Sequence, residues 1–489
     1  MPTFQEIESV LQQASSLAAD YLRANADHES PVIQCKAPAQ LERMLKLELP
    51  QEGRPLGSLL EDMKVFLKHS VHVGHPRFLN QLFGGQDAAG ILGEWMTAVL
   101  NTSMYTYESA PVGTLVELKL IDELNAAVGF SEGDGVLAPG GSISNLMALL
   151  TARQVHFPGV KELGLPDGCR PSIFHSDQAH YSIKRAAVVA GLGSERSIAV
   201  ASDAEGRMLP QALELALQES KARGETPFFV VATSGTTVPG AYDPIAPISK
   251  LAQKHGLWLH VDASYGGSVL LSKQLRPLMA GVEEAHSVTW NPHKMMGVPL
   301  ACSAILMREK GLLLATNGMG AEYLFHDDMH GSYNLGDLSL QCGRRVDAFK
   351  LWFGWQVMGQ RGYAARVEHL FQMSADFAAM IEARENFELA RVPHGPNVCF
   401  RYLPSHAKPK DEAQRREWQG QATERIRAQL MESGRFMINY ADLDDVATFR
   451  NVSTNPDTSH ADLQALLDAI EEFGRQMDFS PLARQKMAP

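Results

Sequence analysis

The chain has few cysteines, no excess of basic residues and no long apolar run, and each shortage excludes a class of protein. Its 489 residues include five cysteines without Cys-x-x-Cys spacing, which argues against a disulfide scaffold and predicts reduced thiols. Basic residues number 44 against 56 acidic ones, so a net charge of −12 without a Lys/Arg patch predicts no binding to nucleic acid. No apolar stretch approaches the roughly 18 residues of a membrane span, so we expect no membrane partner.

The first ten residues also differ in charge from a secretory signal. They carry acidic residues where a secretory signal would carry basic ones, so we expect a cytoplasmic protein. Hydrophobic residues make up 45% of the chain, enough to bury a large core.

Strand-like and helix-like runs alternate between about residues 75 and 308. Apolar, β-branched runs alternate with helical runs such as 211–222 and 245–255; the strand-like runs are 228–232, 257–261, 288–290 and 302–307. This alternation predicts an α/β fold with a mostly parallel, doubly wound sheet.

The flanking sequence differs in character from this central part. The opening, from residue 4 to about 67, has helical spacing interrupted near two prolines. After about residue 345, a helical run leads into a smaller unit with strand-like and charged helical segments. We therefore predict an N-terminal helical segment (1–74), a large domain (75–345) and a small C-terminal α+β domain (346–489).

The most informative residue is Lys294, which follows the strand-like run 287–290 in the sequence Asn291-Pro292-His293-Lys294. At the end of a buried strand a lysine loses solvation, and desolvation favours the neutral amine that condenses with an aldehyde. Asp262 follows the preceding run, 257–261, and a buried carboxylate needs a cationic partner such as a protonated pyridine nitrogen. The ends of neighbouring strands share one crevice, which predicts that both residues face it. An ion-paired or helix-capping aspartate beside an unrelated lysine is the alternative.

A glycine-rich turn supplies a candidate anion site. Gly141 and Ser142 follow the short strand 135–138 and open the helical run 146–154. Small residues let backbone N–H groups approach an anion, and the helix N-terminus adds its positive dipole end. Alone, the turn also fits an ordinary capped helix start. Beside Lys294 and Asp262 it completes the requirements of pyridoxal 5′-phosphate (PLP), which has an aldehyde, a ring nitrogen and a phosphate.

The motifs around these residues resemble those of the group II PLP-dependent amino-acid decarboxylases. The matching segments are 75–82 (HPRFLNQL), 139–142 (PGGS), 260–267 (HVDASYGG), 291–294 (NPHK) and 341–347 (QCGRRVD). The resemblance covers about residues 75 to 456 and is strongest to the acidic amino-acid branch, which contains glutamate decarboxylase and cysteine sulfinate/aspartate decarboxylase. It implies fold type I of the PLP-dependent transferases, a PLP cofactor and a homodimer with shared active sites.

The resemblance also implies a role for each candidate cofactor-binding residue. Lys294 would form a Schiff base with the cofactor, and Asp262 would keep the ring nitrogen protonated. His180 would stack on the ring, since a flat imidazole suits that position, and Thr237 would line its edge. The residues that would hold the phosphate are Gly141, Ser142, Asn291 and His293.

Substrate choice depends on Phe83, two residues after Gln81, and on Arg450. Arg450 matches the family arginine that receives a substrate carboxylate, for which a planar guanidinium is suited. At the position of Phe83, typical glutamate enzymes have a small residue, and the cysteine sulfinate and aspartate branch has Phe. A ring there would remove room for the extra methylene of glutamate. Phe83 can also be read as core filling, and the segment 294–299 (KMMGVP) is closer to the animal glutamate enzymes.

We therefore expect α-decarboxylation of aspartate to β-alanine and of cysteine sulfinate to hypotaurine, with glutamate decarboxylation to 4-aminobutyrate as the alternative. A PLP aminotransferase or lyase would use the same residues, because the fold does not fix which Cα bond breaks. A PLP-binding protein without turnover is a third interpretation.

The segment 326–335 departs from the family pattern. It is about two residues shorter and has no unambiguous counterpart of the tyrosine that protonates the substrate carbon. His330 and Tyr333 are the candidates for that role, since either side chain can act as a general acid. His326, Asp327, Asp328 and His330 also resemble a metal cluster, but an exposed polar loop explains them, so no metal is predicted.

Overall fold

The computed structural model describes residues 2–45, 47–85, 87–321 and 330–479. The chain divides into two compact units. The smaller comprises residues 1–86, 372–392 and 396–489, and the larger comprises residues 87–371 and 393–395. The three-part division at residues 74 and 345 stays a prediction.

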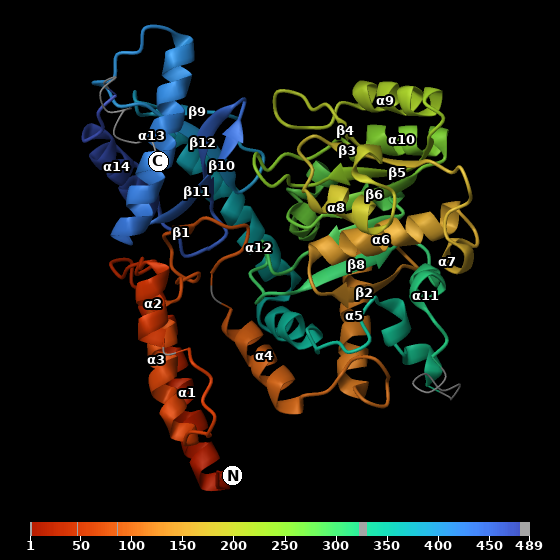
Figure 1. Ribbon diagram of the computed structural model, residues 1–489, viewed down its shortest axis with the longest axis horizontal. Helices are drawn as coiled ribbons and strands as arrows, with labels where there is room; N and C mark the ends of the chain where they lie inside the picture. Colours follow the sequence, from red (N-terminus) through yellow and green to blue (C-terminus); the bar gives the residue numbers. More distant parts are fainter. Residues whose placement is uncertain (1, 46, 86, 322–329, 480–489) are drawn as a thin grey trace. The chain divides into compact units, whose positions relative to one another are not determined.

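The larger unit is built on a seven-stranded sheet in the order β2-β8-β7-β6-β5-β3-β4 (Figure 1). The five strands from β4 to β7 in this order are parallel, whereas β8 is antiparallel to both of its neighbours, β7 and β2. The predicted mostly parallel α/β sheet is confirmed. The strands are β2 (Asp134–Ala138), β3 (Pro171–Ser176), β4 (Ser197–Val200), β5 (Thr226–Thr233), β6 (Trp258–Ala263), β7 (Ser287–Trp290) and β8 (Ser303–Met307).

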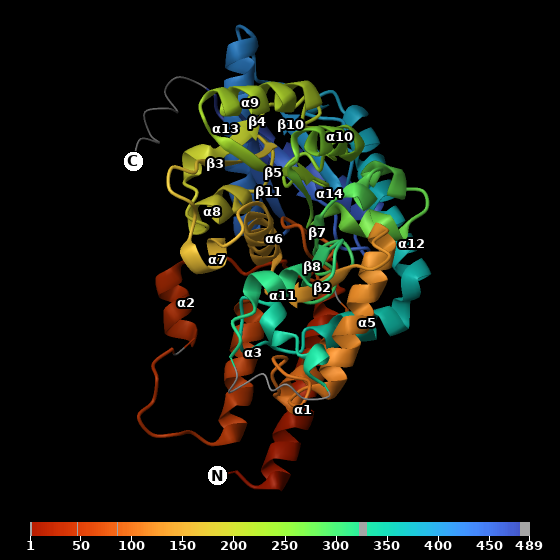
Figure 2. The ribbon, with the colours of Figure 1, turned by 90° about the vertical axis from the view of Figure 1, so that its right-hand side faces the viewer.

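Helices connect these strands and pack against the sheet. Buried side chains of α6 and α8 join those of β2, β3 and β5 in one core cluster, while α9 and α10 lie side by side (Figure 2). The helices of this unit are α4 (Ala88–Leu100), α5 (Pro111–Val128), α6 (Gly141–His156), α7 (Val160–Leu163), α8 (Ser182–Val189), α9 (Pro210–Ala222), α10 (Ile245–His255) and α11 (Leu312–Asn317).

The helix α12 (Ala348–Glu382) contributes to both units and bends at Gly359, whose φ of 61° lies in the left-handed region. Glycine tolerates this conformation because it has no Cβ. The element therefore consists of two helical segments that meet at Gly359.

The smaller unit has a five-stranded sheet in the order β1-β11-β12-β10-β9. The strands are β1 (Phe78–Leu79), β9 (Phe387–Leu389), β10 (Asn397–Tyr402), β11 (Met437–Leu443) and β12 (Val446–Val452). Its helices are α1 (Phe4–Asn25), α2 (Pro38–Leu45), α3 (Leu59–His69), α13 (Glu412–Ser433) and α14 (His460–Arg475). Because β1 pairs with β11 in parallel, the segment after β1 is brought to the C-terminal sheet.

No helix in the described part of the chain has the length and apolar character needed to cross a membrane.

Candidate active site

Seven of the predicted cofactor-binding residues line one cavity of about 270 Å³ in the larger unit. The cavity lies where β5, β6 and β7 end and α6 begins, at the carboxyl edge of the parallel strands, as expected for an open α/β sheet. These seven residues are Gly141, Ser142, His180, Thr237, Asp262, Asn291 and Lys294.

Lys294 is half-buried in the cavity wall, four residues after the end of β7. Burial lowers the pKa of its amine to about 8, although the nearby carboxylate of Asp262 opposes this shift. An amine with that pKa is neutral in about a tenth of molecules at pH 7, more than a hundred times the fraction of an ordinary lysine. It can therefore attack an aldehyde without a separate base.

Asp262 is buried at the end of β6 and is held as an anion by its neighbours. Burial alone would raise its pKa, but a hydrogen bond from Ser264 N to Oδ1 (3.1 Å), the charge of Lys294 and a bond from Asn145 Nδ2 to Oδ2 (2.9 Å) outweigh it. The pKa of Asp262 therefore lies below its usual value, so the group is ready to pair with a cation in the cavity.

The start of α6 and Asn291 fit a phosphate. The helix starts directly after Gly140, whose φ of 129° requires glycine. The backbone N–H groups of the first helical turn have no acceptor within the helix, so they can donate to an anion. A Cβ at Gly141 would lie 2.6 Å from Ser264 Oγ and 2.8 Å from Asn291 Nδ2, so only a glycine leaves this approach open. Asn291 Oδ1 accepts a hydrogen bond from Ser303 (2.6 Å), which leaves its N–H groups as the donors for an anion.

His180 also lines the cavity and is fixed by Ser182, whose Oγ lies 2.8 Å from His180 Nδ1. Burial is the main cause that lowers the pKa of His180, so the ring is neutral at pH 7. His293 does not line the cavity; it is buried, with Nδ1 2.6 Å from Cys302 O.

The predicted substrate-binding residues belong to the smaller unit. Arg450, on β12, is buried and donates from Nη2 to Asn80 O (2.9 Å), which places it beside the segment that contains Gln81. Phe83 is half-buried, with its ring 6.2 Å from that of Phe78, and Gln81 is exposed. The structure therefore brings Arg450 next to the segment 80–83 within one unit.

His330 and Tyr333 lie beside Tyr107, with ring centroids 5.1 Å and 5.4 Å from it. Neither is among the residues that line the cavity described above. His326, Asp327 and Asp328 lie outside the described residues.

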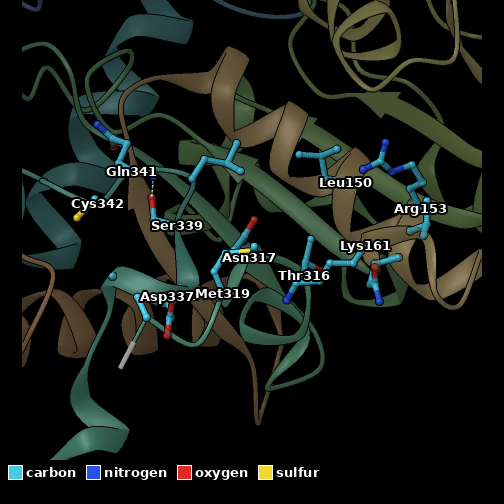
Figure 3. A pocket seen from close by; sticks show the side chains of 15 residues that line it. Leu150, Arg153, Lys161, Thr316, Asn317, Met319, Asp337, Ser339, Gln341 and Cys342 are labelled. Atoms are coloured by element: carbon cyan, nitrogen blue, oxygen red, sulfur yellow. Dashed lines mark hydrogen bonds between the residues drawn. The ribbon is translucent and has the colours of Figure 1, made fainter. Parts of the chain in front are cut away.

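A second cavity of about 470 Å³ contains none of the predicted site residues. Figure 3 shows Arg153 and Lys161 at one side of it and Gln341 and Cys342 at the other. Both cations donate to backbone carbonyls: Arg153 Nη1 to Ala190 O (2.8 Å) and Lys161 Nζ to Ala315 O (3.1 Å). We interpret these cations as caps of helix C-terminal ends.

Sequence reasoning missed Asn145 and Ser264 as residues that hold Asp262. Ser264 lies inside the motif 260–267, and Asn145 follows the motif 139–142. Asn145 is four residues after Gly141, so it shares a face of α6 with the anion site. That spacing is the signal that would have found it.

Comparison with known proteins identifies the family. The model of the pyridoxal-dependent decarboxylase conserved domain matches residues 38–403. Crystal structures of mouse CSAD, cysteine sulfinic acid decarboxylase, align at 39% identity and TM-score 0.92 in the apo form, covering 96% of this chain and 99% of that one. A second mouse CSAD structure aligns at 38% identity and TM-score 0.94, covering 97% and 100%.

A more distant match is the glutamate decarboxylase domain of the diaminobutyrate-pyruvate transaminase and L-2,4-diaminobutyrate decarboxylase from Vibrio parahaemolyticus. It aligns at 26% identity and TM-score 0.84 over 96% of both chains. The chain belongs to the pyridoxal-dependent decarboxylase family. Within it, the chain is a group II, PLP-dependent amino-acid decarboxylase of the acidic branch, which confirms the resemblance, the fold class and the cofactor.

Proposed function

We propose that the enzyme removes the α-carboxyl group of short acidic amino acids, with cysteine sulfinate and aspartate preferred to glutamate. The observation that carries this proposal is the likeness to mouse CSAD over nearly the whole chain, together with Phe83 beside the segment that Arg450 contacts. Glutamate is the alternative substrate, because the Vibrio domain is also similar, at lower identity.

Each proposed site residue has a separate role toward the cofactor or the substrate. Bound PLP supplies an aldehyde for the substrate amine and a protonated ring that accepts the electron pair released as carbon dioxide leaves. Lys294 would provide the neutral amine that holds the aldehyde, and Asp262 would provide the negative charge that keeps the ring nitrogen protonated. The N–H groups at the start of α6 and of Asn291 would hold the phosphate. Arg450 binds the acid group of the substrate side chain, so that the α-carboxyl group alone is left to depart.

A competition assay tests the substrate. The PLP-loaded enzyme receives aspartate, cysteine sulfinate and glutamate together, and amine products, keto acids and carbon dioxide are quantified. Excess β-alanine or hypotaurine is the expected result. Dominant 4-aminobutyrate would overturn the substrate preference, keto acid in place of carbon dioxide would indicate an aminotransferase, and no product at all would indicate a PLP-binding protein without turnover.

Replacing Phe83 with alanine should raise kcat/KM for glutamate relative to aspartate by about 10-fold or more. The physical reason is room for one methylene, which is worth about 1–3 kcal/mol in a pocket. Phe78→Ala is the matched control: Phe78 is buried against Phe83, so its loss should reduce stability without changing the substrate ratio. An unchanged ratio in Phe83→Ala would show that Phe83 only fills space.

Tyr333→Phe and His330→Gln separate the two candidate proton donors. Each variant removes one donor beside Tyr107 while keeping a side chain of similar size. The variant that lacks the side chain which protonates the substrate carbon should lose about 100-fold or more in kcat, because general acid catalysis contributes about 10²–10⁴-fold. Single-turnover release of carbon dioxide and of amine should be compared, since a missing proton donor delays the amine alone. A residue whose variant keeps both rates is not the donor.

We also propose a cytoplasmic homodimer, for which α4 offers an apolar face. Five of its side chains are between 42% and 79% exposed and recur at helical spacing; they are Leu92, Trp95, Met96, Val99 and Leu100. An apolar stripe of this kind on an exposed helix is typical of a face that a second copy covers.

Trp95→Glu should raise the dissociation constant of the dimer by about 30-fold or more, because a central aromatic side chain typically contributes 2 kcal/mol or more. Analytical ultracentrifugation over a concentration series measures this constant. Leu215→Glu is the control, since Leu215 is equally apolar and 57% exposed but lies on α9. If both variants remain dimers, α4 is not the interface.

A further inference from the structure

A continuous chain of buried hydrogen bonds runs behind Asp262. Trp258 Nε1 lies 2.8 Å from Ser287 Oγ, and Ser287 Oγ lies 2.8 Å from His260 Nδ1. His260 Nε2 lies 3.0 Å from Asn145 Oδ1, and Asn145 Nδ2 lies 2.9 Å from Asp262 Oδ2. The chain thus crosses β6 and β7 and reaches the cavity through α6.

The first member of this chain is compatible with one direction of its bonds. The indole nitrogen of Trp258 can only donate, so Ser287 Oγ accepts from it, and the hydroxyl hydrogen of Ser287 is left to be donated to His260 Nδ1. His260 is buried, which lowers its pKa to about 4 and leaves the ring neutral, with a single proton. When Nδ1 accepts from Ser287, that proton is on Nε2 and is donated to Asn145 Oδ1.

The opposite end of the chain requires the same direction. Asp262 is ionised and can only accept, so Asn145 must turn its N–H groups toward it and its oxygen toward His260. A bare His260 Nε2 would then face the oxygen of Asn145 without a hydrogen between them. The anion at this end therefore fixes one arrangement of protons, and the donor at the other end agrees with it.

A branch of the chain reaches His180. The second N–H of Asn145 is directed to Ser182 Oγ (3.1 Å), and the backbone N–H of Ser182 is directed to His180 Nδ1 (3.2 Å). A backbone N–H can only donate, so Nδ1 accepts and the proton of the neutral ring is on Nε2. A charged His180 would place an N–H at Nδ1 against the N–H of Ser182, so the branch favours the neutral ring.

We propose that Trp258, Ser287, His260 and Asn145 are positioning residues that form a one-way hydrogen-bond chain, which holds Asp262 as an acceptor and His180 as the neutral, Nε2-protonated ring. None of the four acts on the substrate. This inference rests on the proposed roles of Asp262 and His180 toward PLP, whereas the proton positions themselves do not depend on the substrate. Both N–H groups and the oxygen of the Asn145 amide are used, which makes it the branch point.

Neutron diffraction from crystals of the PLP-loaded enzyme in D₂O tests the proton positions. We expect deuterium on Nε2 and none on Nδ1 in both His260 and His180. Deuterium on Nδ1 of His260 would overturn the one-way chain, and deuterium on Nδ1 of His180 would overturn the branch. The result stands whichever acidic amino acid the enzyme prefers, so failure of this inference and failure of the proposed function are distinguishable.

Two variants of His260 test what the chain does. In His260→Gln an amide can still accept from Ser287 and donate to Asn145, whereas His260→Phe keeps a ring of similar shape without either bond. We expect His260→Phe to bind PLP about 10-fold or more weakly, because Asn145 is then no longer held toward Asp262 and a hydrogen bond to a charged group contributes roughly one to two powers of ten. His260→Gln should restore binding to within about threefold. Fluorescence quenching measures the dissociation constant, and the absorption band of bound PLP reports the state of its ring.

His175→Phe is the matched control. His175 is buried on β3, next to β5 in the same sheet, and bonds to Ser176 and Ser197 away from Asp262. Its loss should reduce stability to a similar extent while leaving PLP affinity and the absorption band unchanged. Equal losses of affinity in His175→Phe and His260→Phe would overturn the positioning role, as would native affinity in His260→Phe. Should His260→Phe fail to fold, the neutron result decides.

Discussion

Lys294→Arg should lower the rate of decarboxylation by about 10³-fold or more, the scale of losing a reacting group, while the protein stays folded. Arginine keeps the positive charge near Asp262 but cannot lose its proton, so no neutral amine is present to hold the aldehyde. Borohydride treatment followed by mass spectrometry should attach PLP to the peptide containing Lys294 in the native enzyme. The same treatment should leave the variant unmodified.

Lys350→Arg is the control for this prediction. Lys350 is buried, yet Nζ lies 2.7 Å from Glu94 Oε1 and 2.9 Å from Asp347 Oδ1. Burial opposes its charge, but the two carboxylates outweigh burial and raise its pKa, in contrast to Lys294. We expect Lys350→Arg to change activity by at most about 10-fold, as a packing defect of about 1 kcal/mol would. A Lys294→Arg enzyme that turns over as fast as this control would remove Lys294 from its proposed role.

The sequence predicted the sheet and most of the cavity because both depend on local patterns. Apolar runs such as 257–261 and 288–290 mark buried strands, and the residues that follow them meet at one sheet edge by the geometry of parallel strands. Lys294, Asp262 and Gly141 could therefore be grouped without coordinates. His293 was grouped with them only by its place in the motif, and the structure buries it against Cys302 outside the cavity lining.

Long-range pairing and proton positions could not be predicted in this way. Nothing local shows that β1 pairs with β11, more than 350 residues later, or that Arg450 contacts Asn80. The proton on His260 depends on Asp262, which reaches His260 through Asn145 of α6, and the other ring nitrogen meets Ser287 of another strand. Such a chain is visible only when its donors and acceptors are placed in space.

Asp262→Asn should lower kcat by about 10³-fold, which is the size of the loss when a charge that stabilises a transition state is removed. An amide has the same shape and can still accept from Asn145, so the hydrogen-bond chain survives, but it has no negative charge to keep the ring nitrogen protonated. PLP should still bind through the phosphate site and Lys294. The absorption band of bound PLP should shift, because its ring would lose the nitrogen proton.

Asp243→Asn provides the comparison that decides between charge and packing. Asp243 is also a buried aspartate of the larger unit, but burial raises its pKa to about 7, and its oxygens accept backbone N–H groups of Met208 and Thr233. Its charge has no partner in the cavity, so the variant should lose stability and at most about 10-fold in kcat, as a structural defect would. Equal losses in both variants, with no shift of the absorption band in Asp262→Asn, would mean that Asp262 supports the fold rather than the ring nitrogen. A large loss confined to Asp262→Asn would assign the effect to its charge. Both substitutions replace one carboxylate oxygen with an amino group at a buried position, so they differ mainly in what that charge faces.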